Sequence, residues 1–351
     1  MMESRNGSSF RASSRLVGVC LLATLSTCVA QGEQPKLHAA RAPHLPLVRV
    51  ADLELPGRAK RFDYQDVDVA ENHLVVAHMG DDSVLVLRLS DGTVEKVLGN
   101  VTTPRGVAIG DNVGRIFVTS LPSSLVIIDN KTLTELGRVP TGSAPDGVAY
   151  DAQDRVVGVS DQGDGALSLI AGAGNGKRIQ VRLGSETGNV VFDSARHCFW
   201  ITVAASHGVD QLIGVEPLAG IVTLRIALPG CRGAHGLRIH PNGLGAFVAC
   251  EDNAVLARVD LGGAHAVVTA ATGANPDVMA LDSSLGWLYV AAESGDLVVF
   301  DITRPGLTAI DREHPFDHAH SVAVDVATHR VFFPLEVGPS GKPVLRIMHP
   351  Q

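Results

Sequence analysis

The sequence has few aromatic residues and no haem-attachment motif. Phe, Trp and Tyr make up 4% of its 351 residues, with two tryptophans and three tyrosines. There is no Cys-x-x-Cys-His segment and no tryptophan-rich stretch, which excludes a covalently attached c-type haem and a tryptophan-derived quinone. After residue 30 no apolar run approaches the roughly 20 residues of a membrane-spanning helix. We therefore expect neither an electron-transfer subunit nor a transmembrane segment in the mature chain.

An excess of positive charge is also lacking. The full chain carries 29 Lys and Arg residues against 37 Asp and Glu residues. Without the first thirty residues the counts are 26 basic and 36 acidic residues, a net charge of −10. A chain of this charge repels a phosphate backbone, so we exclude nucleic acid as a partner.

The first thirty residues resemble an export signal. Three arginines precede the apolar run "LVGVCLLATLSTCVA", which is too short to span a bilayer and ends in small residues at Ala30. We expect a signal peptide over residues 1–30, a leader over 31–45 and a periplasmic or secreted protein. In an alternative interpretation, "LSTC" is a lipobox and Cys28 carries a lipid anchor.

The remaining chain repeats a strand–turn–strand pattern seven times, as in "GVAYDAQDRVVGVS" and "GLRIHPNGLGAFVAC". Successive copies are offset by 42, 41, 42, 47, 42 and 43 residues, and each continues into a third and a fourth strand. A four-stranded unit with this period is typical of a β-propeller blade. We predict an all-β, seven-bladed propeller over residues 46–351. The copies align on seven turn residues, called anchors here: Asp68, Gly110, Asp151, Asp193, His240, Asp282 and Asp325.

The two ends of the repeat predict how the ring closes. The seventh copy has three strands and no fourth, while the strand "PLVRVADLEL" precedes the first copy without a blade of its own. We predict that this N-terminal strand completes blade seven and removes an exposed sheet edge.

The blade pattern G-V-A-x-D, with "TGSAPDGVAYD" as its clearest copy, resembles the YVTN-repeat, YncE-like propellers. The resemblance extends over all seven blades and implies an extracytoplasmic seven-bladed propeller. It does not imply one activity, because such propellers include lactonases, lyases, electron-transfer subunits and simple binders.

Two sets of residues should converge on one mouth of the central channel, since the start of each inner strand and the end of each second strand lie on the same face. The first set lies five residues before each anchor: Asp63, Arg105, Asp146, Gly188, His235, Asp277 and His320. The second set lies at the ends of the second strands: Met79, Leu121, Asp161, a position near Val203, Glu251, Glu293 and Glu336. In blades five to seven a His or Asp precedes a Glu by sixteen residues.

These residues support two interpretations. In the first, they are polar groups lining a water-filled channel, where Asp63, Arg105, Asp146 and Asp161 contact a small molecule or a partner protein without catalysis. In the second, a divalent cation (Mg²⁺, Mn²⁺, Zn²⁺ or Ca²⁺) is the cofactor of a lyase or lactonase. Its candidate ligands are Asp277, Glu251, Glu293 and Glu336, and the candidate catalytic acids or bases are His235 and His320.

A resemblance to virginiamycin B lyase-like propellers bears on the second interpretation. Those proteins are seven-bladed and hold a metal with glutamates near the channel mouth, with a histidine as base. The comparable positions of this chain are His235, Glu251 and Glu293. The chain departs from that pattern at two positions, with Asp277 in place of an expected glutamate and Met279 in place of an expected nearby histidine.

Three cysteines remain after the signal segment. Cys231 lies just before the inner strand of blade five and Cys250 ends its second strand, so we expect them to form a disulfide. A zinc site using both thiolates is the alternative. Cys198 is predicted to be a buried free thiol. Three further histidines are expected as surface residues on the opposite face: His73, His197 and His329.

Overall fold

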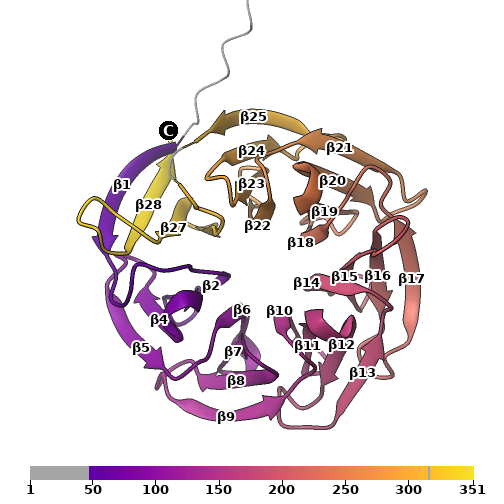
Figure 1. The fold of residues 1–351 in the computed structure, drawn as a ribbon, viewed down its shortest axis with the longest axis horizontal. Coiled ribbons are helices and arrows are strands. Elements are labelled where there is room, and N and C mark those ends of the chain that lie inside the picture. Colours follow the sequence, from indigo (N-terminus) through magenta and orange to yellow (C-terminus); the bar gives the residue numbers. More distant parts are fainter. Residues whose placement is uncertain (1–46, 315–316) are drawn as a thin grey trace, which may run out of the picture. The chain divides into compact units, whose positions relative to one another are not determined.

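The computed structural model describes residues 47–314 and 317–351, which form seven four-stranded antiparallel sheets in a ring around a central channel (Figure 1). The predicted fold and blade number are confirmed. The expected signal peptide, the leader and Cys28 lie outside the described residues. No helix among the residues described has both the length and the apolar character needed to cross a membrane.

Each blade runs from an inner strand at the channel to an outer strand at the rim. Blade one consists of β2 (Gln65–Asp68), β3 (His73–His78), β4 (Ser83–Arg88) and β5 (Val94–Gly99). Blade two consists of β6 (Pro104–Gly110), β7 (Arg115–Ser120), β8 (Ser124–Asp129) and β9 (Glu135–Pro140). Blade three consists of β10 (Pro145–Asp151), β11 (Val156–Asp161), β12 (Ala166–Ile170) and β13 (Arg178–Arg182).

Blades four to seven continue in the same order around the ring. Blade four consists of β14 (Glu186–Asp193), β15 (Cys198–Ala204), β16 (Gln211–Val215) and β17 (Val222–Ala227), and blade five of β18 (Ala234–Ile239), β19 (Gly245–Cys250), β20 (Val255–Asp260) and β21 (Val267–Ala271). Blade six consists of β22 (Pro276–Asp282), β23 (Trp287–Ala292), β24 (Leu297–Asp301) and β25 (Thr308–Glu313). Blade seven consists of β26 (Ala323–Asp325), β27 (Arg330–Leu335), β28 (Val344–Pro350) and β1 (Leu47–Glu54).

Blade seven joins the two ends of the described chain, as predicted. β1 pairs antiparallel with β28, the last strand of the sequence (Figure 1). Arg346 on β28 donates two hydrogen bonds of 2.8 Å to the carboxylate of Asp52 on β1. This pairing supplies the fourth strand of blade seven, covers the edge of β28 and closes the ring.

The core lies between blades because one sheet cannot cover both of its own faces. Second and third strands are almost fully buried, whereas the outer strands alternate between exposed and half-buried residues. One buried cluster joins Phe247 and Leu256 of blade five to Leu288, Val290 and Phe300 of blade six. Burial of such large side chains contributes about 1.5–3 kcal/mol each, so face-to-face blade packing stabilises the ring.

The anchor aspartates organise the turn that follows each inner strand. The Oδ1 atom of Asp151, for example, accepts hydrogen bonds from the backbone N–H groups of Gln153 and Asp154. Asx turns of this kind explain why Asp recurs at this position of the repeat. The histidines expected on the surface of this face are more buried than predicted: His73 is buried, and His197 and His329 are half-buried.

Candidate functional site

β-Bulges direct the first set of residues into the channel mouth. In blades two to six the register between the first and second strands shifts at the residue five before the anchor, for instance between Ala234 and Leu237 of β18. The shift leaves His235 and Gly236 out of the regular ladder. A bulge bends the strand and re-aims its side chains, so a repeated bulge makes a ring of inward-pointing groups at one end of the channel.

Close approach of neighbouring inner strands explains the glycine after the bulged residue. A side chain at Gly236 would overlap the backbone carbonyl oxygen of Asp277 in the next blade. The bulge leaves the carbonyl oxygen of His235 outside the strand ladder, and the Thr202 hydroxyl of the preceding blade donates a 2.6 Å hydrogen bond to it. The backbone that carries His235 is therefore held by both neighbouring blades.

The mouth contains a polar cavity of about 420 Å³. Most of the predicted site residues line it, from blades one, two, three, five and six. The lining residues are Arg61, Asp63, Met79, Arg105, Asp146, Gln162, His235, Glu251, Asp252, Asn275, Asp277 and Glu293. Six of them carry carboxylates and two carry guanidinium groups, so this mouth cavity has an excess of negative charge when its acids are ionised.

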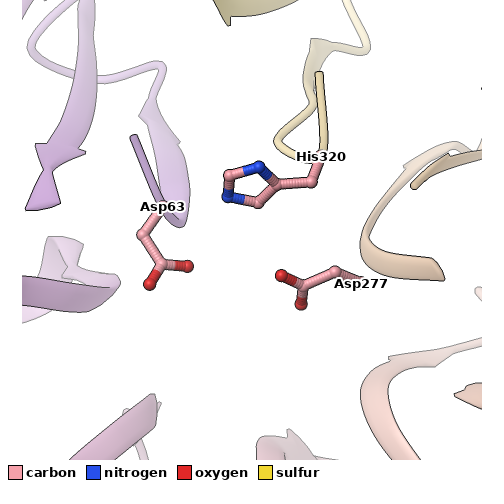
Figure 2. Close-up of side chains that lie close together, drawn as sticks. All are labelled: Asp63, Asp277 and His320. Carbon is pink, nitrogen blue, oxygen red and sulfur yellow. The ribbon is translucent and has the colours of Figure 1, made fainter. Parts of the chain in front are cut away.

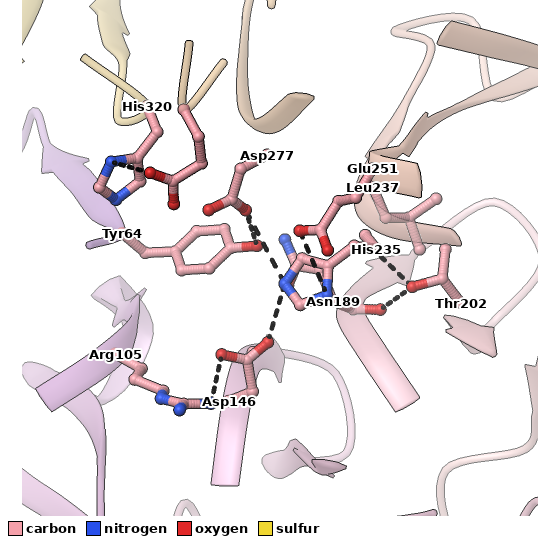
Figure 3. A network of polar contacts seen from close by, with 12 residues as sticks. Tyr64, Arg105, Asp146, Asn189, Thr202, His235, Leu237, Glu251, Asp277 and His320 are labelled. Atoms are coloured by element: carbon pink, nitrogen blue, oxygen red, sulfur yellow. Dashed lines mark hydrogen bonds and ion pairs between the residues drawn. The ribbon is translucent and has the colours of Figure 1, made fainter. Parts of the chain in front are cut away.

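His235 lies at the centre of the mouth cavity with a carboxylate beside each ring nitrogen (Figure 3). Its Nε2 is 3.3 Å from Asp146 Oδ2 and 3.8 Å from Asp277 Oδ1, and its Nδ1 is 3.8 Å from Glu251 Oε1. The side chain is 15% exposed, so its carboxylate contacts are only weakly screened by water.

These contacts shift the pKa values of the central groups. Burial disfavours a charged imidazole, but the contact with Asp146 and the charges of Asp277 and Glu251 raise the pKa of His235 well above its ordinary value. Burial would also raise the pKa of Asp146, but His235 and Arg105 lower it. Burial and the negative charge of Asp277 raise the pKa of Glu251 to about 7, against the opposing effect of His235. The site therefore holds an ion pair beside a carboxyl group that titrates near neutrality.

A second group of side chains lies on the other side of Asp277. The carboxylates of Asp63 and Asp277 face the buried imidazole of His320 (Figure 2). His320 Nδ1 is 3.7 Å from Glu293 Oε2 of the preceding blade, whereas its Nε2 is buried without a hydrogen-bond partner. Burial and the charges of Asp277 and Asp146 raise the pKa of Asp63 well above its ordinary value, which favours the neutral form of this carboxyl group.

Arg61 supplies positive charge to this second group. Its guanidinium donates a hydrogen bond to Glu293 Oε1 and lies 3.7 Å from Asp277 Oδ2. It therefore already provides a cation next to Asp63, Asp277 and His320. Two sets of donor atoms in the described chain approach one another closely enough to hold a metal ion at this mouth, Asp63–Asp277–His320 and His235–Glu251–Asp277. Asp277, beside Arg61, belongs to both sets. The His235 set is the better candidate because its other carboxylate, Glu251, has no guanidinium partner among the described residues.

Three predicted site residues are not among those that line the mouth cavity: Asp161, Glu336 and His320, which belongs to the second group described above. Asp161 is fully buried in blade three, where its carboxylate accepts hydrogen bonds from the Gly142 N–H and the Ser168 hydroxyl. The second set of residues follows each anchor by eleven positions, so Gln162, which does line the cavity, is the residue equivalent to Glu251. The prediction was therefore one residue too early, and neighbouring residues of a strand point to opposite faces of the sheet.

Glu336 is also absent from the lining of the mouth cavity. The sixteen-residue spacing predicted that it would pair with His320, as Glu251 pairs with His235. Blade seven differs because β26 begins only at Ala323, which leaves His320 in the preceding loop rather than on an inner strand. His320 consequently contacts Glu293 of blade six.

Sequence reasoning missed Arg61, Gln162 and Asn275, all of which line the mouth cavity. Arg61 and Asn275 each lie seven residues before their anchor, two residues before the predicted ring. Residues two apart on an extended chain point to the same side, so this spacing was the signal that could have identified them.

Comparisons with known proteins identify the fold. No protein-family model matches the chain, and no curated protein matches its sequence. Hydrazine synthase from Kuenenia stuttgartiensis is similar in structure, with a TM-score of 0.69 and 13% identity over 85% of this chain and 98% of that one. Virginiamycin B lyase from Staphylococcus aureus has a TM-score of 0.69 and 12% identity over 86% of this chain and 98% of its own. At these identities the likeness shows a common propeller fold and nothing further.

Proposed function

We propose that the chain is an extracytoplasmic, YncE-like propeller whose mouth cavity binds a small polar molecule through a divalent cation. The cation would be held by His235, Glu251 and Asp277, leaving open positions for oxygen atoms of the ligand. The observation that carries this proposal is the convergence of an imidazole and carboxylates from three blades on one cavity of about 420 Å³.

The spacing of the donor atoms supports a cation. Ligands about 2.0–2.2 Å from one ion lie roughly 3.0–3.5 Å from each other. The donor atoms of His235, Glu251 and Asp277 all lie within 4.8 Å of one another, so movements of roughly an ångström would complete a coordination shell. The mixed nitrogen and oxygen donors favour Mn²⁺ or Zn²⁺ over Ca²⁺, which prefers six to eight oxygens.

The charge of the mouth cavity supports the same conclusion. The carboxylates of Asp146, Asp252, Asp277 and Glu293 outnumber the three cationic groups of Arg61, Arg105 and His235, and Glu251 adds negative charge when it is ionised. Such an imbalance in a partly enclosed space attracts cations and repels anions. Arg61 and Arg105 also line the cavity, and their guanidinium groups would contact polar groups of a ligand bound to the ion.

Export is supported by the N-terminal pattern and by the Cys231–Cys250 disulfide, since structural disulfides persist in oxidising compartments. N-terminal sequencing of protein secreted by a bacterial host would test this part of the proposal. Cleavage after Ala30 is the expected result, whereas a lipid-modified Cys28 would indicate anchoring instead.

Calorimetric titration with Mn²⁺ and Zn²⁺ tests the cation. We expect one ion per chain at the mouth cavity, with affinity reduced at least tenfold in Glu251→Gln and in His235→Ala. Glu336→Gln is the matched control, because Glu336 occupies the equivalent position of blade seven but does not line the cavity. Equal affinities in Glu251→Gln and Glu336→Gln, or absence of binding to the wild type, would refute the proposal.

A metal-dependent lyase or lactonase is the second candidate, favoured by the carboxylate contacts on both nitrogens of His235. If the carboxylates alone held the cation, the charged imidazole of His235 beside it would be able to deliver a proton to a leaving oxygen. Incubation of the metal-loaded protein with cyclic esters, followed by mass spectrometry, separates the reactions. Elimination opens the ring without a change in mass, hydrolysis adds one water, and an unchanged substrate leaves binding as the function.

A further inference from the structure

A separate cluster of ionisable side chains lies at the other end of the inner strands. Asp151 is the last residue of β10, the strand that carries Asp146 into the mouth cavity. Five residues of extended strand place the two positions about 17 Å apart. Asp151 is joined there by Asp154 from the following turn and by His197 from the turn between β14 and β15 of blade four.

The three side chains direct one atom each towards a common point. His197 Nε2 is 2.9 Å from Asp154 Oδ2 and 3.6 Å from Asp151 Oδ2. All three of these atoms are buried and none has a hydrogen-bond partner, because the contacts lack the direction of a hydrogen bond. Buried polar atoms without a partner are costly, so an ion between them would remove a defect of the fold.

The other anchor aspartates show how unusual this arrangement is. Asp68, Asp193, Asp282 and Asp325 each accept a hydrogen bond at Oδ2 from a nearby side chain. The donors are Asn130, Arg196 together with Trp200, His329 and Thr328, respectively. Among the five anchor aspartates, all of which lie in the described part of the chain, Asp151 alone has an Oδ2 without a donor.

The surrounding contacts hold the donor atoms in place. Asp151 is fully buried, and its Oδ1 is bound by the N–H groups of Gln153 and Asp154, which leaves Oδ2 facing the cluster. The ring of His197 packs edge-on against Phe192, with ring centroids 5.9 Å apart. Such supporting contacts around metal ligands fix their orientation and increase affinity.

We propose that Asp151, Asp154 and His197 form a binding site for a divalent transition metal that joins blades three and four. The imidazole nitrogen lies 2.9 and 3.6 Å from the two carboxylate oxygens, and all three atoms lie within 4.8 Å of one another. Small movements would place them at three corners of a tetrahedron with metal–ligand distances of about 2.0–2.2 Å. Water would supply the fourth ligand once an ion separates the three buried donor atoms, since the rest of the His197 side chain is 34% exposed. Three donors are too few for Ca²⁺. The mouth cavity does not reach this site. Because its ligands come from two blades, a bound ion would stabilise the packing of blade three against blade four.

Native mass spectrometry with Zn²⁺ tests the site. His197→Ala and Asp154→Asn should each bind one Zn²⁺ fewer than the wild type. His329→Ala is the matched control, because His329 occupies the equivalent turn of blade seven but donates a 2.7 Å hydrogen bond to Asp282. It should bind as many ions as the wild type. Melting temperatures in EDTA confirm that each variant is folded.

Glu251→Gln distinguishes this site from the one proposed at the mouth. In that variant Zn²⁺ should still raise the melting temperature, and adding His197→Ala should abolish the increase. If the mouth binds no ion, the wild type should bind one Zn²⁺ and His197→Ala none. Equal numbers of bound ions in the wild type, His197→Ala and Asp154→Asn would overturn the proposal.

Discussion

The hydroxyl of Tyr64 donates a 3.3 Å hydrogen bond to Asp277 Oδ1 across the central channel (Figure 3). Tyr64 comes from blade one and Asp277 from blade six. Asp277 lines the mouth cavity, whereas Tyr64 lines a second cavity of about 420 Å³ farther along the inner strands. Burial, together with the charges of Asp277 and Asp146, raises the pKa of Tyr64 well above its ordinary value, so it remains a donor. This bond marks the boundary between the two cavities.

Tyr64→Phe should lower the free energy of unfolding by about 1–2 kcal/mol, because it leaves a buried carboxylate without its neutral donor. Tyr150→Phe is the control. The Tyr150 hydroxyl also donates to a side chain, Asn112, but that bond is exposed to water, and its loss should cost less than about 0.5 kcal/mol. Urea unfolding of both variants measures the difference, and equal losses would contradict the assigned role of Tyr64.

Asp66, which faces the second cavity, should make stability depend on pH. Burial raises the pKa of Asp66 to about 6, although bonds from the Val67 and Ile109 N–H groups oppose the shift. The folded chain then binds this proton more tightly than the unfolded chain. The free energy of unfolding should therefore fall as pH rises from about 4 to 6.

Asp66→Asn removes this titration and should flatten that part of the pH profile. Chemical unfolding at intervals between pH 4 and pH 7 provides the measurement. A wild-type slope that persists unchanged in Asp66→Asn would assign the dependence to another group.

The ion pair that closes the ring should contribute to stability. Arg346 and Asp52 are both largely buried and form two parallel hydrogen bonds of 2.8 Å. Arg346→Ala should lower the free energy of unfolding by about 1.5–3 kcal/mol. Arg49 also contacts Asp52 but is 60% exposed, so Arg49→Ala should cost less than about 1 kcal/mol. Thermal and urea unfolding of the two variants would show whether the buried pair matters more.

The Cys231–Cys250 disulfide should stabilise the fold by about 2–4 kcal/mol, since it closes a loop of nineteen residues in the unfolded chain. Cys231→Ala combined with Cys250→Ala should lower the melting temperature, and so should reduction of the wild type. Cys198→Ala removes the buried free thiol and should leave the sensitivity to reductant intact. Because Glu251 directly follows Cys250, the double variant should also bind Mn²⁺ more weakly in calorimetric titration.

The architecture could be predicted from sequence because its information is local and repeated. Seven copies at a nearly constant period each specify one blade, and the missing fourth strand of the last copy matches the extra strand before the first. The disulfide was predicted for the same reason, since Cys231 and Cys250 lie at ends of neighbouring strands in one blade. The blades and the disulfide needed only contacts within a blade, and the pairing of β1 with β28 followed from the strand that the last copy lacks.

The functional surface depended on contacts between blades. The sequence placed His235, Glu251 and Asp277 at one mouth, but not the guanidinium of Arg61 beside Asp277, nor the pairing of His320 with Glu293 instead of Glu336. It also could not show that Asp151 Oδ2 lacks a donor where the Oδ2 atoms of the other anchor aspartates have one. By itself the sequence determined the seven-bladed propeller, because each blade is specified by a repeat of strands along the chain. Only the tertiary structure decided which charges meet, because side-chain direction depends on bulges, strand starts and the adjoining blade.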